Sequence, residues 1–351
     1  MRTFDPFLLV HWKINLYFCS GKKLVNHMIR LTTIIFLLLG VQIQAQQLSQ
    51  YSLWLLNPYA YNPACAGLEP SLVANGVYRQ QWIDLDGAPV TQQINVHLPL
   101  RFLSSGAGLR IENDAIGAHR TTQAMLSYNY QLNAGAGVLA IGGGVGYQQY
   151  LLDGSRIRTP QGDYRDQVFQ HNDAFLPLGS ISIGTPVMEL GVSFSTDRIL
   201  LGLSSQPVFS PVIKEKSPGQ FQLQPERHYI FQGAYTWETS NNLVLKPGLL
   251  FKTDGVKMQA EVGAVGYWKD KFTAGLGYRG LTGATSRDAV IIMAGVGIND
   301  KTTLYYGYDV PLSGLKSTNR GSHEVMLRYN MNKPLGVGKN PPVIYNPRYV
   351  N

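Results

Sequence analysis

Residue types that carry out bond-making chemistry are present in this chain, but their spacing does not gather them into a site. A metal centre needs several imidazole, thiolate or carboxylate ligands close together, and a serine hydrolase of one common class needs its nucleophile in a Gly-x-Ser-x-Gly turn. No such turn occurs in the 351 residues. The histidines after residue 45 stand far apart, at His97, His119, His171, His228 and His323. The sequence therefore predicts no enzyme activity, no metal site and no cofactor.

Two short motifs resemble ligand-binding loops only in part. Residues 84–87, Asp-Leu-Asp-Gly, have the start of a calcium loop without its remaining ligands or final glutamate, so a hairpin turn explains them better. Residues 135–137, Gly-Ala-Gly, resemble part of a dinucleotide-binding loop, but they open an expected strand rather than a helix. The glycines that follow indicate strong curvature or the close approach of an internal segment; they are Gly142, Gly143, Gly144 and Gly146.

The beginning of the chain has the pattern of a secretory signal. Arg30 precedes an apolar run over residues 31–41 that is too short to span a bilayer, and small residues follow it. We expect translation to begin at Met28 and cleavage to follow Ala45, so that residues 1–45 are an over-long start plus a signal peptide. That stretch contains five basic residues and one acidic residue, half of the net charge of +8. What remains contains no basic stripe, so nucleic acid is not expected as a partner.

Composition favours an all-β protein. The chain is 44% hydrophobic and 15% charged, which is too apolar for a disordered protein, and it lacks the repeated apolar runs of a helical membrane protein. Its 37 glycines and 20 tyrosines suit many strands joined by tight turns. Between residues 71 and 331, apolar and polar side chains alternate with a period of two, as in a strand with one apolar face. We expect fourteen such segments, at 71–82, 90–99, 105–112, 119–132, 137–150, 187–195, 198–206, 226–238, 242–253, 256–268, 271–282, 288–299, 302–310 and 322–331; the alternation is least clear in 105–112 and 288–299.

The lengths of the links decide between two architectures for this pattern. A soluble sandwich or propeller buries the apolar face against a second sheet, whereas an outer-membrane barrel turns it toward lipid. Links after even-numbered segments are short, and those after odd-numbered segments are mostly longer, which is the asymmetry of outer-membrane barrels. The links expected on the longer side are 83–89, 113–118, 151–186, 207–225, 283–287 and 311–321. The sequence therefore predicts a transmembrane barrel of about 14 antiparallel strands at 71–331, with both termini on the short-turn, periplasmic side.

The two ends of the barrel sequence lack the alternation. Residues 46–70 contain Pro58, Pro63 and several aromatic side chains, which favours an extended, turn-rich segment inside the barrel or on its periplasmic mouth. Residues 332–351 have no strand pattern and are expected to form a periplasmic tail.

In a barrel, certain charged side chains are expected to face the lumen, where they either pair with each other and with 46–70 or set the ion selectivity of a pore. These are Arg79, Lys246, Glu261, Arg279, Glu324 and Arg328.

The same N-terminal segment carries a resemblance to a known family. Asn57-Pro58 and Asn62-Pro63-Ala64, closed by Ala66-Gly67, resemble the N-terminal hallmark of the PorP/SprF family, and Ser49-Gln50-Tyr51, Lys246-Pro247, Gly277-Tyr278-Arg279 and Ser322-His323-Glu324 are also similar to it. Cys65 stands where an aromatic residue is expected. The resemblance implies an outer-membrane β-barrel of the Bacteroidetes type IX secretion and gliding machinery.

The resemblance also implies what such a barrel does. It implies partners in the periplasm and outer membrane, among them a peptidoglycan-binding lipoprotein, and support for export or surface anchoring of an adhesin or another secreted protein. The leading hypothesis is therefore a non-enzymatic scaffold in membrane lipid, and the alternative is a diffusion porin for small solutes. The longest loops mix charges and aromatic residues, which suits protein docking but also suits a merely solvated loop. Their residues of this kind are Arg156, Arg158, Asp163, Arg165, Asp166, Phe169, Phe209, Lys214, Glu215, Lys216 and Phe221.

Overall fold

The structure is a computed structural model that describes residues 48–165, 168–173, 176–209, 211, 213–214, 222–223, 225–280 and 287–335. The expected signal peptide and most of the expected tail lie outside these residues. Within them, strands dominate. Their bounds are β1 Val73–Gln80, β2 Val90–Leu100, β3 Ser105–Ile116, β4 His119–Ala134, β5 Gly137–Asp153, β6 Ser180–Ser195, β7 Ile199–Phe209, β8 Ile213–Lys214, β9 Gln222–Leu223, β10 His228–Tyr235, β11 Trp237–Ser240, β12 Leu243–Thr253, β13 Met258–Trp268, β14 Phe272–Gly280, β15 Arg287–Gly297, β16 Thr302–Pro311 and β17 Ser322–Asn330.

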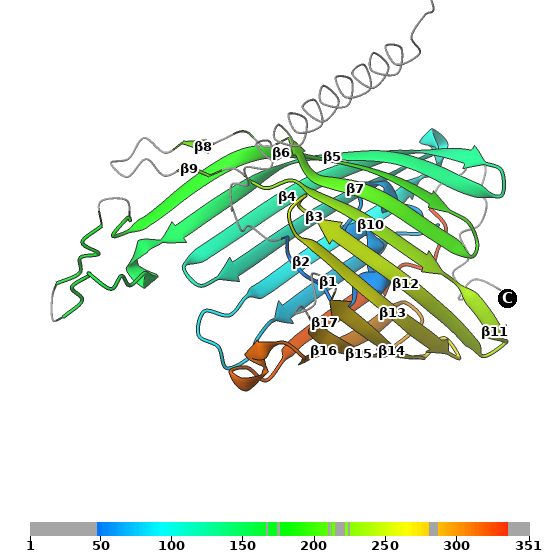
Figure 1. Cartoon of the computed structure of the whole chain (residues 1–351). Coiled ribbons are helices and arrows are strands. Elements are labelled where there is room, and N and C mark those ends of the chain that lie inside the picture. Colours follow the sequence, from blue (N-terminus) through cyan, green and yellow to red (C-terminus); the bar gives the residue numbers. More distant parts are fainter. Residues whose placement is uncertain are drawn as a thin grey trace, which may run out of the picture. The chain divides into compact units, whose positions relative to one another are not determined.

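The large sheet closes on itself. Antiparallel neighbours run from β10 through β7 down to β1, then through β17 back to β12, and β12 pairs with β10. β11 continues β10 along the same partner, so that the two count as one strand of a 14-stranded barrel. Figure 1 shows the strands wrapping around the blue N-terminal segment. The all-β barrel predicted from the period of two is confirmed.

Short 3₁₀ turns complete the described structure. Three of them lie in the N-terminal segment, and their compactness lets that segment fill the barrel rather than follow its wall. Their bounds, and those of the other three, are η1 Trp54–Leu56, η2 Pro58–Ala60, η3 Pro63–Cys65, η4 Arg101–Leu103, η5 Gly154–Arg156 and η6 Gly314–Ser317. No helix among the described residues is long and apolar enough to cross a membrane.

The outer surface of the barrel is apolar because every second side chain points away from the lumen. In β4, Leu126 and Tyr128 are 63% and 48% exposed, whereas Ser127 and Asn129, which alternate with them, are buried. The two segments with unclear alternation have a physical explanation. β15 is apolar on both faces, because Ile291 points inward onto other apolar side chains. In β3, two of the inward positions are the glycines Gly106 and Gly108, and a Cβ on Gly108 would lie 2.3 Å from the Tyr59 hydroxyl.

Three details differ from the sequence-based expectation. β3 continues to Ile116, so the expected link 113–118 is mostly strand and only a two-residue turn remains before β4. β6 begins at Ser180, seven residues before the expected segment, so the preceding link is 154–179. Finally, the ladder between β10 and β12 stops at Ala234 opposite Gly248 and resumes at Trp237 opposite Leu245. This break lies beside Pro247, which has no N–H to donate.

The two rims of the barrel differ. We call the end with the β2–β3, β4–β5, β6–β7, β11–β12, β13–β14 and β15–β16 turns the short-turn rim, and the opposite end the long-loop rim. β1 begins and β17 ends at the short-turn rim. The described chain itself begins at the opposite end: Leu48 lines a cavity at the long-loop rim, and Gln50 bonds Gln259 at the start of β13. The N-terminal segment therefore threads the whole lumen, and its first described residue is not at the rim that the sequence analysis assigned to the N-terminus.

Candidate functional site

The lumen is filled by residues 48–70, which we call the plug segment. Nearly all of its side chains from Tyr51 to Leu68 are buried. One wall of the barrel meets it with apolar side chains: Leu53, Trp54 and Leu55 of the plug segment join a cluster with Val77, Ile230, Leu250, Val265, Ile291, Met293, Tyr305 and Met326. The opposite wall, from β2 to β7, meets it mainly with polar groups. The segment is therefore held as a folded core rather than as a loose insertion.

A group of buried charges near the long-loop rim fixes the beginning of the plug segment. We call it the charge cluster; its members are Arg79, Lys252, Glu261, Arg279, Asp309 and Glu324. Arg79, which is 0% exposed, is 2.7 Å from Asp309 Oδ2 through Nη2 and 3.2 Å from Glu324 Oε2 through Nη1. Arg279 pairs with Asp309 at 2.8 Å and with Glu261 at 3.1 Å. Pairing of this kind offsets the large cost of burying each charge alone.

Ser52 connects this cluster to the plug segment. Its backbone N–H donates to Glu324 Oε2 at 2.6 Å, and its hydroxyl donates to Asp309 Oδ1 at 2.5 Å. The same hydroxyl accepts from Arg79 Nη1 at 2.7 Å and from Arg279 Nη2 at 3.1 Å. Four charged side chains from four strands thus converge on one plug residue.

A second ion pair lies on the polar wall of the lumen. Arg110 of β3 and Glu189 of β6 are 2.6 Å apart, although two strands lie between them in the sheet. Arg110 also donates to the carbonyl of Ala60 at 3.1 Å, and Tyr59 donates to Ser127 at 3.1 Å. The pair therefore bridges the wall of the barrel and the middle of the plug segment.

The end of the plug segment is held at the short-turn rim. Arg328 pairs with Glu69 and donates to the carbonyl of Leu56 at 3.4 Å. Lys246 donates to the carbonyl of Leu55 at 3.2 Å. The cationic groups at this end thus bind plug carboxylate and carbonyl oxygens, so that they do not stand free in an open pore.

The Asn-Pro residues that carry the resemblance shape the turns of the plug segment. Asn62 caps η3 by accepting from the Ala64 N–H at 2.9 Å, and Pro63 takes the first position of that turn, where no N–H is needed. Asn62 also donates to the carbonyl of Val192 at 3.1 Å. Asn57 accepts from Asn75 at 3.3 Å, and Pro58 opens η2. The motif therefore sets both the turns and their docking onto the barrel wall.

Two small hallmark residues let the plug segment lie close to the barrel wall. Ala64 is fully buried against β5, and Gly67 has φ +62° and lies so close to β2 that a Cβ there would be 2.4 Å from the Leu98 carbonyl oxygen. Cys65 is buried as well, and Gln232 donates to its sulfur at 3.1 Å. A cavity of about 180 Å³ lies beside it, lined in part by Leu68 and Lys246. The small side chain at this position leaves space that a larger one would fill.

The matched pair Gly142 and Gly143 tests the fit between plug and wall. A Cβ on Gly142 would lie 2.9 Å from both the N and the Cα of Ala64, whereas one on Gly143 would lie 3.2 Å from the flexible end of Leu190 and 3.4 Å, an ordinary contact distance, from the Glu189 carbonyl oxygen. We expect Gly142→Ala to lower the free energy of unfolding by about 1–3 kcal/mol, because backbone atoms must move. Gly143→Ala should change it by less than about 0.5 kcal/mol. Urea unfolding in detergent micelles measures both, and equal effects would contradict a tight plug.

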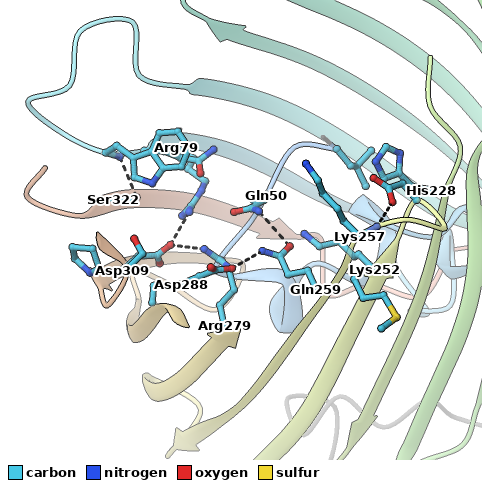
Figure 2. Close-up of a pocket in the computed structure, with 18 of the residues that line it drawn as sticks. Gln50, Arg79, His228, Lys252, Lys257, Gln259, Arg279, Asp288, Asp309 and Ser322 are labelled. Atoms are coloured by element: carbon cyan, nitrogen blue, oxygen red, sulfur yellow. Dashed lines mark hydrogen bonds and ion pairs between the residues drawn. The ribbon is translucent and has the colours of Figure 1, made fainter. Parts of the chain in front are cut away.

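A cavity remains above the charge cluster, at the long-loop rim. Its volume is about 380 Å³. Figure 2 shows Arg79, Arg279 and Asp309 on one side of it and His228, Lys252 and Lys257 on the other. It is a vestibule closed from below by the plug segment and the cluster. Among the described residues, no group of three or more His, Cys, Asp or Glu side chains has an arrangement that holds a metal ion.

The structure brings the expected lumenal charges into two places. Arg79, Glu261, Arg279 and Glu324 belong to the charge cluster, whereas Lys246 and Arg328 lie toward the short-turn rim. The sequence analysis missed several partners that complete these contacts: Ser52, Arg110, Glu189, Lys252 and Asp309. For the four charged residues the available signal was an inward position in the alternation of their strands; Ser52 lies in the plug segment, where no such pattern exists. Of the loop residues, Arg158 stacks on Tyr164 and Phe169, and Arg165 pairs with Asp163. Asp166, Glu215, Lys216 and Phe221, and the side chain of Lys214, lie outside the described part of the chain.

Comparison with known protein families gives one decisive result. A family model described as type IX secretion system membrane protein PorP/SprF matches residues 43–329, which include the plug segment and nearly the whole barrel. The chain belongs to the PorP/SprF family. This PorP/SprF protein is accordingly a membrane component of the type IX secretion system and a β-barrel of the outer membrane.

Solved structures similar to this PorP/SprF protein include other outer-membrane barrels. Omp33 of Acinetobacter baumannii is 6% identical, with a TM-score of 0.44 over 76% of this chain and 100% of that chain. The toluene transporter TbuX of Ralstonia pickettii is 10% identical, with a TM-score of 0.44 over 79% and 92%. A FadL homologue of Pseudomonas aeruginosa is 10% identical, with a TM-score of 0.43 over 75% and 89%. A search of curated proteins gave no match.

Proposed function

We propose that this PorP/SprF protein is a non-enzymatic scaffold of the type IX secretion and gliding machinery. Its short-turn rim and tail would hold periplasmic partners, including a peptidoglycan-binding lipoprotein, and its long loops would support export or surface anchoring of an adhesin or similar protein. The observation that carries the proposal is the filled lumen. A plug segment held by buried ion pairs and an apolar cluster suits a structural component better than a diffusion pore.

The orientation and processing of the chain are part of this proposal. We infer that residues 1–45 are removed on export and that the short-turn rim faces the periplasm, as in barrels whose longer loops are extracellular. Under this orientation the C-terminal end of β17 is periplasmic. The backbone N–H of Leu335 donates to the carbonyl of Pro70 at 3.1 Å, which supports a tail that starts at the short-turn rim. The start of the plug segment would then lie at the extracellular mouth.

Affinity purification from native outer membranes in mild detergent tests the scaffold. We expect periplasmic type IX components to co-purify with the barrel. Alanine substitution of Lys269, Asp270 and Lys271 on the short-turn rim should lower their recovery by about fivefold, because charged rim contacts govern association. Alanine substitution of Asp84 and Asp86 at the long-loop rim is the matched control and should leave periplasmic recovery unchanged. Isolation of the barrel alone, with none of these components, would contradict the proposal.

A further inference from the structure

The turn between β13 and β14 carries two lysines on its membrane-facing side. Residues 268–272 of this turn read Trp-Lys-Asp-Lys-Phe. The ammonium group of Lys269 lies over the Trp268 ring, 5.1 Å from its centroid, and that of Lys271 lies over the Phe272 ring, 5.9 Å from its centroid. Both rings are exposed on the outer face of the barrel, and their centroids are 5.8 Å apart. The two positive charges therefore lie beside the outer wall at the short-turn rim.

Backbone hydrogen bonds hold this turn from both sides. The N–H of Lys269 donates to the carbonyl of Asn242 in the β11–β12 turn at 2.9 Å, and the N–H of Gly297 at the end of β15 donates to the carbonyl of Lys271 at 2.7 Å. The two central residues, Lys269 and Asp270, have φ +50° and +52°, as in a type I′ hairpin turn. Because the backbone is fixed in this way, a ligand of the two lysines has only their side chains to order.

Neither ammonium group has an ionic partner in the described part of the chain. The ion pairs among the described residues include neither Lys269 nor Lys271. Asp270 stands between them in the sequence, but it lines the cavity at the short-turn mouth of the lumen. An aromatic ring under an ammonium group stabilises the cation and leaves N–H donors free for another ligand. The turn therefore presents two cations whose complement is an anionic group beside the outer wall.

The outward side chains next to the two lysines suit a lipid. Exposed aromatic residues at strand ends mark the level of the lipid headgroups, and Trp268 and Phe272 are such residues. In the next row of outward positions toward the membrane centre, three neighbouring strands carry short side chains: Gly266 is opposite Ala274, and Ala274 is opposite Ala294. We call these three residues the short row. It leaves room for an acyl chain next to the two ammonium groups, where the chain gains dispersion contacts with the wall.

We propose that this surface binds an anionic phospholipid of the periplasmic leaflet. The lipid phosphate accepts hydrogen bonds from the ammonium groups of Lys269 and Lys271, and one acyl chain packs on the short row beside Trp268. Charge complementarity selects an anionic headgroup over a zwitterionic one. The choice of a phospholipid rests on the proposed function, whose orientation places the short-turn rim in the periplasmic leaflet; the cationic surface itself rests on the geometry of the turn.

Native mass spectrometry of the protein purified in mild detergent tests the proposal. With equal amounts of phosphatidylglycerol, phosphatidylethanolamine and lipopolysaccharide added, the wild type should retain mainly phosphatidylglycerol. Lys269→Gln/Lys271→Gln should lower the ratio of bound phosphatidylglycerol to bound phosphatidylethanolamine about tenfold, because the two charges that attract the anionic headgroup are removed. Lys301→Gln/Lys333→Gln removes two exposed charges of the same rim outside this turn and should leave the ratio unchanged.

Three outcomes of this experiment would overturn the proposal. The first is equal retention of the two phospholipids by the wild type. The second is an unchanged ratio in Lys269→Gln/Lys271→Gln, or an equal fall in the control variant. The third is preferential retention of lipopolysaccharide, which would also contradict the proposed orientation of the barrel.

A substitution in the short row tests the place of the acyl chain. A Cβ on Gly266 would lie nearest to the flexible end of Leu245, at 3.2 Å, so Gly266→Leu is accommodated and fills the row. Retention of phosphatidylglycerol should fall about fivefold, because the new side chain takes the space of the acyl chain. Gly76→Leu is the matched control: it adds the same bulk to the outer face of β1, where a Cβ would meet nothing within 4 Å, and should leave retention unchanged. A folded Gly266→Leu variant with wild-type retention would overturn the proposal.

The same variant separates this proposal from the scaffold function. Gly266→Leu leaves Lys269, Asp270 and Lys271 in place, so co-purification of periplasmic components should be unchanged while lipid retention falls. A barrel that retains no phospholipid but still co-purifies with those components would overturn the lipid site alone. A barrel that retains the phospholipid but is isolated without them would contradict the scaffold alone.

Discussion

Replacing Arg79 with alanine is expected to lower the free energy of unfolding by about 3–5 kcal/mol, the range for removing one partner of a buried ion pair. The guanidinium is 0% exposed and contacts Asp309, Glu324 and Ser52. Without it, Glu324 loses its cationic partner and retains only the N–H groups of Ser52 and Leu53. Urea unfolding in micelles measures the change. Loss of the heat-resistant folded band in gel electrophoresis is a second measurement of it.

Arg320 provides the matched control for this substitution. Its pair with Asp84 is also short, at 2.8 Å, but the Arg320 side chain is 85% exposed. Exposed ion pairs contribute little to folding stability, so Arg320→Ala should lower the free energy of unfolding by less than about 1 kcal/mol. Arg79→Lys retains the charge, but an ammonium group cannot contact two carboxylates and a hydroxyl with the planar geometry of a guanidinium. The free energy of unfolding of this variant should therefore lie between those of the wild type and Arg79→Ala. Similar losses for Arg79→Ala and Arg320→Ala would contradict a structural role for the charge cluster.

The barrel itself was predictable because each strand has an apolar outer face and a polar inner face. Outward-facing side chains such as Leu126 and Tyr128 recur at every second residue. This spacing can be recognised in the sequence of a single strand. The beginning of β6 escaped prediction although Ser180 to Val187 also alternate. Gly184 and Pro186 are typical of turns, and only the structure shows that β7 pairs with β6 no earlier than Met188, so that the missing N–H of Pro186 costs no bond to β7.

The contacts across the lumen were not predictable from one strand at a time. Arg110 and Glu189 meet on the lumenal side of the two strands that separate β3 from β6, and alternation does not specify which inward side chains of different strands meet. Asp309 is last but one in its expected segment, where nothing distinguished it from a loop residue. Ser52 has no charge at all, yet it receives contacts from four strands. Burial of the plug segment creates these partnerships, and the sequence pattern could say only that inward charges need partners.

The plug segment also determines whether this barrel conducts. We expect the purified wild-type protein to show no steady ion current in planar bilayers, because the plug segment fills the lumen below the long-loop vestibule. Deletion of residues 48–69 should produce a stable, open channel, since barrels of about this size enclose a cavity or channel when side chains or a plug do not fill them. The measurement is single-channel conductance at fixed voltage. A steady current from the wild-type protein would favour the diffusion porin over the scaffold.

Two additions keep this conductance experiment decisive. A synthetic peptide with the sequence of residues 48–70 should close the deletion variant again, whereas a scrambled peptide of the same composition should not, because closure depends on Ser52 and the Asn-Pro turns meeting their partners.

If the deletion variant does not fold, Asp309→Asn combined with Glu324→Gln preserves side-chain volume and removes the carboxylates that hold Ser52. This variant should show intermittent openings, because the apolar contacts of Leu53 and Trp54 still hold the plug segment while its attachment to the cluster is lost. A folded double variant as silent as the wild type would show that the apolar contacts alone keep the lumen closed and that the charge cluster has no part in closure.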